Sequence, residues 1–60
     1  MAEDLIDTIR ETVKFLRTSA AELRQMANGS EPEVAQSLRH MVDQCEAEAE
    51  ELAERFGIWP

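Results

Sequence analysis

The sequence predicts an all-α protein, an antiparallel two-helix hairpin that dimerises into a four-helix bundle. Three observations lead to this fold class. Helix-forming residues fill two stretches separated by one break, apolar residues recur every three or four positions, and 60 residues with 43% apolar content build only a small core. Eight of the apolar residues are alanines. A two-helix unit with so few large side chains needs a partner, and we expect a homodimer.

The first helix is expected at about residues 3–27, where helix formers dominate, and the turn at 28–32. Gly29 is expected to take the left-handed conformation that often ends a helix. Ser30 and Glu33 have the spacing of a capping box, in which each side chain satisfies a backbone N–H of the other at the start of a helix. The turn is therefore predicted to be short.

The second helix is expected at about residues 32–56. Pro32 fits its first turn, where the backbone N–H has no partner within the helix. Gly57 provides a second stop signal, which leaves residues 57–60 as a C-terminal tail. The whole chain, residues 1–60, is then a single helical hairpin.

The tail carries two large apolar residues, Ile58 and Trp59. Ile58 is placed to fold back on the last turn of the second helix. We expect both side chains to cover the open end of the bundle near Leu5 and Ile9. If Trp59 is exposed instead, it becomes a candidate interface residue.

Apolar periodicity predicts how the helices pack. The first helix has two series at seven-residue spacing, one from Ile6 and one from Ile9. The second helix is less regular, and its contact positions read closer to an eleven-residue repeat. Folding the chain at Gly29 pairs Ala27 with Val34, Ala20 with Met41 and Leu16 with Cys45. The expected core and dimer residues are Ile6, Ile9, Val13, Leu16, Leu23, Leu38, Met41, Cys45, Leu52 and Phe56.

Three short segments resemble the Rop (repressor of primer) family of plasmid regulators, which are helical hairpins of nearly this length. They are residues 13–18 (Val-Lys-Phe-Leu-Arg-Thr), Ser37-Leu38 and Arg55-Phe56-Gly57. The resemblance implies an antiparallel four-helix bundle that binds a pair of kissing RNA loops. It also implies that Phe15, at an outward position between core residues, is the exposed phenylalanine that grips RNA, with Lys14 and Arg17 as its basic neighbours.

The sequence departs from this family at the other RNA-facing positions of the first helix. The family has lysine, asparagine, glutamine and lysine there, whereas this chain has Asp4, Glu11, Ser19 and Met26. Two carboxylates and a thioether are poor partners for phosphate or ribose. The resemblance therefore supports the fold more strongly than the RNA-binding activity.

The first helix also carries a basic stripe, in which Arg10, Arg17 and Arg24 recur every seven residues with Lys14 between them. A net charge of −7 argues against binding nucleic acid or anionic lipid through bulk charge, but a local stripe is able to hold phosphates. In the alternative interpretation, the arginines pair with Glu48, Glu51 or Glu54 on the second helix.

Other candidate sites have an ordinary structural interpretation beside the functional one. Phe15 is either a binding residue or a side chain that widens the dimer contact. Cys45 is expected in the core, because a reactive thiol needs an exposed, electropositive setting. His40 lacks the Glu-x-x-His spacing of di-iron bundles, so no metal or other cofactor is expected. The acidic face of Glu46, Glu50 and Glu54 either binds a basic partner or keeps the surface solvated.

These features predict a non-catalytic protein, because two packed helices bring together no nucleophile, base and orienting partner. The first hypothesis is a Rop-like regulatory homodimer that binds structured RNA through Phe15, Lys14 and Arg17, supported by Arg10 and Arg24. The second is a protein–protein adaptor or inhibitor that uses the acidic second helix or the Phe15 surface, and the third is a bundle with neither activity. No apolar run approaches the length of a membrane span, and the start of the chain lacks the pattern of a signal peptide. We therefore expect a cytoplasmic protein with no membrane partner.

Overall fold

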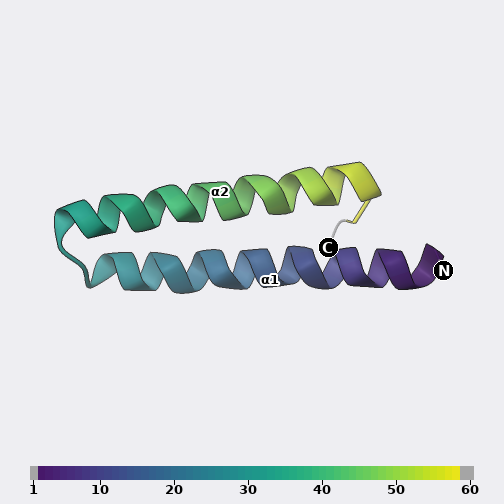
Figure 1. The fold of residues 1–60 in the computed structure, drawn as a ribbon, viewed down its shortest axis with the longest axis horizontal. Helices are drawn as coiled ribbons and strands as arrows, with labels where there is room; N and C mark the ends of the chain where they lie inside the picture. The colour runs from purple at the N-terminus through teal and green to yellow at the C-terminus, as the bar shows by residue number, and fades with distance from the viewer. Residues whose placement is uncertain (1, 59–60) are drawn as a thin grey trace.

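In the computed structural model the chain forms two antiparallel helices joined by a short turn (Figure 1). The first helix, α1, spans Ala2–Asn28, and the second, α2, spans Pro32–Phe56. The structure describes residues 2–58, with side chains from residue 4 onward. The expected position of Trp59 lies outside the described residues. An all-α helical hairpin, 45 Å long, is confirmed.

The end of α1 differs from the prediction. Gly29 does not have a positive φ angle, and among the described residues only Gly57 does. Instead, the backbone N–H groups of Gly29 and Ser30 donate to the carbonyls of Met26 and Ala27, each at 3.2 Å. The Ser30 hydroxyl also donates to the Met26 carbonyl at 2.7 Å. The two backbone bonds each join a residue to the third residue before it, as in a 3₁₀ turn. They satisfy the last carbonyls of α1 without a left-handed residue.

The predicted capping box is wrong for the same reason. The N-cap of α2 is Glu31, with extended backbone angles and no side-chain capping bond. The hydroxyl of Ser30 is engaged by α1, so it does not cap α2. Pro32 does occupy the start of α2, as predicted. The Ala35 N–H donates to the Glu31 carbonyl at 2.7 Å, which closes the first turn.

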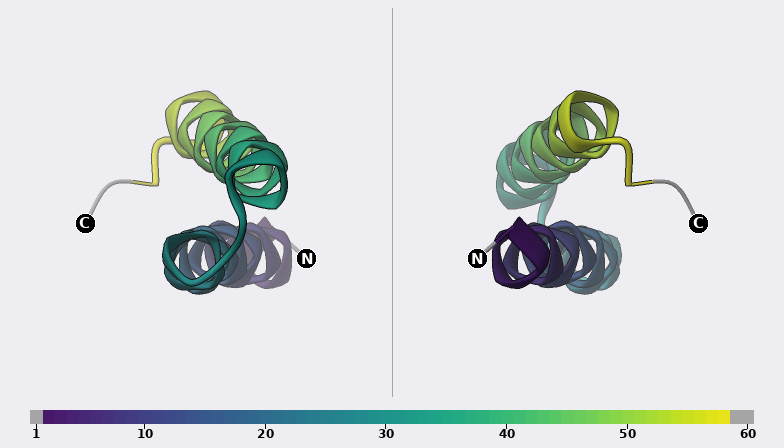
Figure 2. Two further views of the ribbon diagram at one scale, coloured as in Figure 1. Left: turned by 90° about the vertical axis from the view of Figure 1, so that its left-hand side faces the viewer. Right: turned by 90° about the vertical axis from the view of Figure 1, so that its right-hand side faces the viewer.

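The end of α2 follows the prediction. Gly57 is left-handed, with φ 66° and ψ 33°, and its N–H donates to the Ala53 carbonyl. The Ile58 N–H donates to the same carbonyl at 2.8 Å, and the Ile58 side chain is buried. Figure 2 shows the chain turning to one side of the hairpin after α2 and descending towards α1. Leu5 is nevertheless 56% exposed, so the described part of the tail does not bury it.

A seam of small residues holds the two helices together. Buried residues recur at seven-residue spacing on each helix, and alanine predominates among them. Among the residues with described side chains, no large one is fully buried. Alanine lets two helices approach closely but contributes little apolar area, so this seam is thin. Its members are Val13, Ala20 and Ala27 of α1 and Ala35, Val42 and Ala49 of α2.

Two of the expected contacts on α2 are therefore wrong. Met41 is 46% exposed and Val34 is 50% exposed, whereas the residues that follow each of them, Val42 and Ala35, are buried. One position along a helix rotates a side chain by about 100°, enough to move it from the seam to its edge. The seven-residue spacing of the seam also replaces the expected eleven-residue repeat.

Candidate protein and nucleic-acid interfaces

The large apolar side chains form a second row on each helix, three positions after each seam residue, and this row is only half-buried. A step of three residues turns a side chain about 60° backwards around its helix. Because α1 and α2 run in opposite directions, both rows turn to the same side of the hairpin. We call this side the open face. It consists of Ile9, Leu16 and Leu23 of α1 and Leu38, Cys45 and Leu52 of α2.

The open face has an exposed rim, which lies one position before each seam residue and continues at the same seven-residue spacing to both ends of the hairpin. Four large apolar side chains lie on this rim, and each is about half exposed: Leu5, Met26, Val34 and Met41. Met41 was expected among the contact residues and Val34 opposite Ala27, whereas Met26 and Leu5 were not expected in the contact between the helices. The position before a buried alanine or valine would have identified Met26.

A shallow groove of about 340 Å³ lies along the open face. Thr12 and Leu16 line it from α1, and Leu52 lines it from α2. Its remaining walls are polar, and Arg55 there pairs with Glu51 at 2.9 Å. The floor is therefore apolar and the α2 edge is charged, an arrangement typical of a surface that another protein covers.

The opposite flank of the seam is polar and partly covered. Four positions after the seam residues lie Arg10, Arg17 and Arg24 on α1, and Arg39, Glu46 and Ala53 on α2. Arg24 pairs with Glu46 at 2.7 Å across the two helices. Ala53 is fully buried on this flank, where the tail folds back through its bond to Ile58. The described part of the tail, residues 57–58, therefore leaves the open face uncovered (Figure 2).

The basic stripe is divided between paired and unpaired residues. Arg10 pairs with Asp7 on its own helix at 3.3 Å, and Arg24 pairs with Glu46 rather than with the glutamates expected. Within the described part of the chain, Lys14 and Arg17 form no ion pair. These two residues are the only members of the stripe whose charges are fully available to a ligand.

Phe15 is 69% exposed, which confirms that it lies outside the hairpin core. It does not share a surface with the basic residues, however. In the continuous helix α1, Lys14 lies about 100° away from Phe15 and Arg17 lies about 160° away. The residues one turn from Phe15 are instead acidic or carry hydroxyls, and we call this surface the Phe15 flank: Phe15, Glu11, Thr12, Thr18 and Ser19. The five residues predicted to bind RNA therefore do not form one face.

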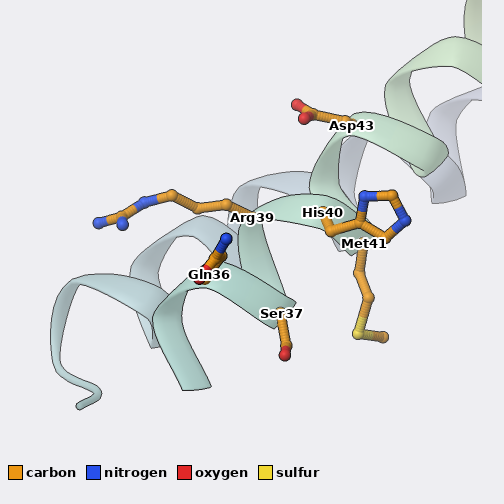
Figure 3. Close-up of a pocket in the computed structure, with 6 residues that line it drawn as sticks. All are labelled: Gln36, Ser37, Arg39, His40, Met41 and Asp43. Carbon is orange, nitrogen blue, oxygen red and sulfur yellow. The ribbon is translucent and has the colours of Figure 1, made fainter. Parts of the chain in front are cut away.

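A depression on α2 contains the histidine considered above (Figure 3). All of its lining residues come from a single stretch of α2, residues 36–43. In Figure 3 Ser37 and Met41 point away from Arg39 and Asp43, so the polar groups do not converge. Among the described residues no three histidine, cysteine or acidic side chains are placed to hold a metal ion. Within that same part of the chain, no helix combines the length and the apolar character needed to cross a membrane.

Cys45 is a free cysteine with a half-buried side chain in the middle of the open face. It therefore lies beside the seam and outside its fully buried row, in a position that a partner would cover.

Comparison of the chain with protein-family models, curated proteins and solved structures found no match. The resemblance to the Rop family therefore depends on the three short segments quoted above.

Proposed function

We propose that this chain is a non-catalytic interaction protein that acts as a homodimeric four-helix bundle. The open face is the observation that carries this proposal. Its six apolar side chains are held side by side by two regular helices, yet none of them is fully buried. Burying them against a second open face would supply the core that the alanine seam does not.

The accessible surface of the hairpin supports an interface of ordinary size. A globular monomer of 6.8 kDa is expected to expose about 3,950 Å². This hairpin exposes 4716 Å², an excess of about 760 Å² over that expectation. In standard protein–protein interfaces each partner buries about 800 Å². A second copy is thus the right size to bring the exposed surface to a normal value.

Phe15 is the candidate anchor for a further partner, and its surroundings favour a protein. The open face lies on the other side of the rim from Phe15, so dimerisation leaves the ring accessible. A large aromatic side chain provides apolar area of the kind enriched in protein interfaces, and the threonine and serine hydroxyls around it resemble the polar rim of such an interface. Glu11, one turn away, would repel phosphate.

RNA binding is the second candidate, and the unpaired charges of Lys14 and Arg17 favour it. These two side chains and their copies provide about four phosphate contacts at most, which predicts weak binding with a shallow dependence on salt. The aromatic ring would not take part in the same contact, because it points away from Arg17.

Sedimentation equilibrium at low micromolar concentration tests the dimer, which should have twice the chain mass of 6.8 kDa. A folded species with the mass of one chain would refute the proposal.

Binding to the immobilised dimer then distinguishes a protein partner from an RNA partner. Phe15→Ala should retain the dimer and abolish protein capture, whereas Thr18→Ala, one turn away, should retain both. Neutralising Glu46, Glu50 and Glu54 together separates the acidic face of α2 from the Phe15 flank. A gel shift of a kissing-loop RNA at low salt, lost in a Lys14→Ala/Arg17→Ala double variant, would favour RNA instead.

A further inference from the structure

We infer that the two copies pack with both turns at the same end of the bundle, so that α1 of each copy lies beside α2 of the other. This inference rests on the proposed dimer and adds the orientation of its two-fold axis. The axis would run parallel to the helices.

Two orientations bring one open face onto another. In the same-end orientation, the neighbours across the dimer interface are α1 and the second copy's α2. In the opposite-end orientation, α1 lies beside α1 and α2 lies beside α2, with the turns 45 Å apart at the two ends of the bundle. Neighbouring helices are antiparallel in both. The apolar residues of the open face therefore do not discriminate between them, and the choice depends on charge and on the rim.

Charge favours the same-end orientation. Helix α1 contains five acidic and four basic residues, whereas α2 contains seven acidic and two basic residues. The opposite-end orientation places the two strongly acidic α2 helices side by side, about 10 Å apart. The same-end orientation separates them to the diagonal of the bundle and places a nearly neutral α1 on both sides of each. Since the Debye length is about 8 Å at physiological ionic strength, this separation weakens their repulsion substantially.

The rim favours the same orientation. Its apolar residues on α2, Val34 and Met41, lie in the half of the hairpin near the turn, together with Met26 of α1. The α2 rim in the other half is charged and consists of Glu48 and Arg55. Same-end packing brings the apolar halves of the two rims together.

Opposite-end packing would instead set Val34 and Met41 against the charged half of the second α2, which leaves apolar area beside ionised groups. Leu5 is the exception, because this exposed apolar rim residue lies at the far end from the turn. It would meet the aliphatic part of the partner's Arg55 in same-end packing.

The orientation also determines where the Phe15 rings lie. With the two α1 helices on the diagonal of the bundle, the two rings lie on opposite sides and cannot grip one symmetric ligand together. Each Phe15 flank instead borders the acidic α2 of the second copy. The dimer would therefore bind two partner molecules independently, one on each side.

Pulsed electron paramagnetic resonance between two spin labels tests the orientation. The label is placed at Glu31→Cys, beside the turn, in a Cys45→Ala background, since Glu31 is exposed and its side chain makes no capping bond. The same-end orientation predicts a label-to-label distance below about 30 Å, because the two turns are separated only by the width of the bundle. The opposite-end orientation predicts a distance near the 45 Å length of the hairpin and would overturn the inference.

A label at Thr18→Cys, near the middle of α1, is the control. In either orientation its two copies are separated only across the bundle and not along its length, so the dipolar signal reports the dimer alone. Loss of the signal from both labels, with the mass of one chain in sedimentation, would refute the dimer itself. If Cys45→Ala prevents dimerisation, Glu31→Lys in the otherwise unchanged chain provides a second readout. A short amine cross-linker should join the two turns only in the same-end orientation, and absence of that product in a cross-linkable dimer would count against it.

Discussion

Replacing Leu16 by alanine distinguishes an isolated hairpin from a dimer, with Val13→Ala as the matched control. Val13 is 4% exposed in the seam, whereas Leu16 is half-buried on the open face three residues later. Burial of one methylene group contributes about 0.8 kcal/mol. Val13→Ala removes two carbons from the seam and should therefore cost about 1.5 to 2 kcal/mol in either state.

The cost of Leu16→Ala depends on the state. In an isolated hairpin Leu16 is partly exposed, so the loss of three carbons is about 1.5 to 2 kcal/mol, similar to that of the control. In a dimer the side chain is covered on both sides, and the loss rises to about 2 to 5 kcal/mol per chain. Leu16→Ala should therefore cost clearly more than Val13→Ala only in the dimer, and the order of the two costs distinguishes the two states.

Thermal and urea denaturation followed by circular dichroism, at concentrations about a hundredfold apart, measures this order. A dimer should also melt at a higher temperature when it is more concentrated, because association stabilises only the folded state. A melting temperature independent of concentration, together with a cost for Leu16→Ala no greater than that for Val13→Ala, would refute the reasoning.

Three further predictions concern single positions. Gly57→Ala should lower the stability by about 1 kcal/mol, because its φ of 66° is strained for any residue with a Cβ atom, whereas Gly29→Ala should be neutral or slightly stabilising; equal effects in urea denaturation would contradict this. A double-mutant cycle on Arg24 and Glu46 should give a coupling below about 1 kcal/mol that decreases with salt, because both side chains are about half exposed; a larger, salt-independent value would indicate that the pair is buried in the dimer. Phe15→Ala should leave the melting temperature within experimental error, and a clear loss of stability would place the ring in the dimer core.

Features that depend on residues adjacent in the chain were predictable from the sequence. The helix boundaries, Pro32 at the start of α2 and the left-handed Gly57 agree with the prediction. The exposure of Phe15 was also predicted, because the seven-residue apolar series places its position outside the contact. The conformation of Gly29 was not, since the Ser30 hydroxyl and two tight backbone bonds provide a second way to end α1. Both endings suit the same residues, and local preference does not choose between them.

The sequence by itself determined that two amphipathic helices form and that each has two adjacent apolar rows. Only the tertiary structure decided which row faces the neighbouring helix. It placed the alanine-rich row in the seam and left the larger residues on the open face, so that Val42 is buried while Met41 is exposed. The physical reason is that helical periodicity fixes the angles between side chains on one helix, whereas the rotation of that helix about its own axis depends on how closely two surfaces can approach, and small residues allow the closest approach.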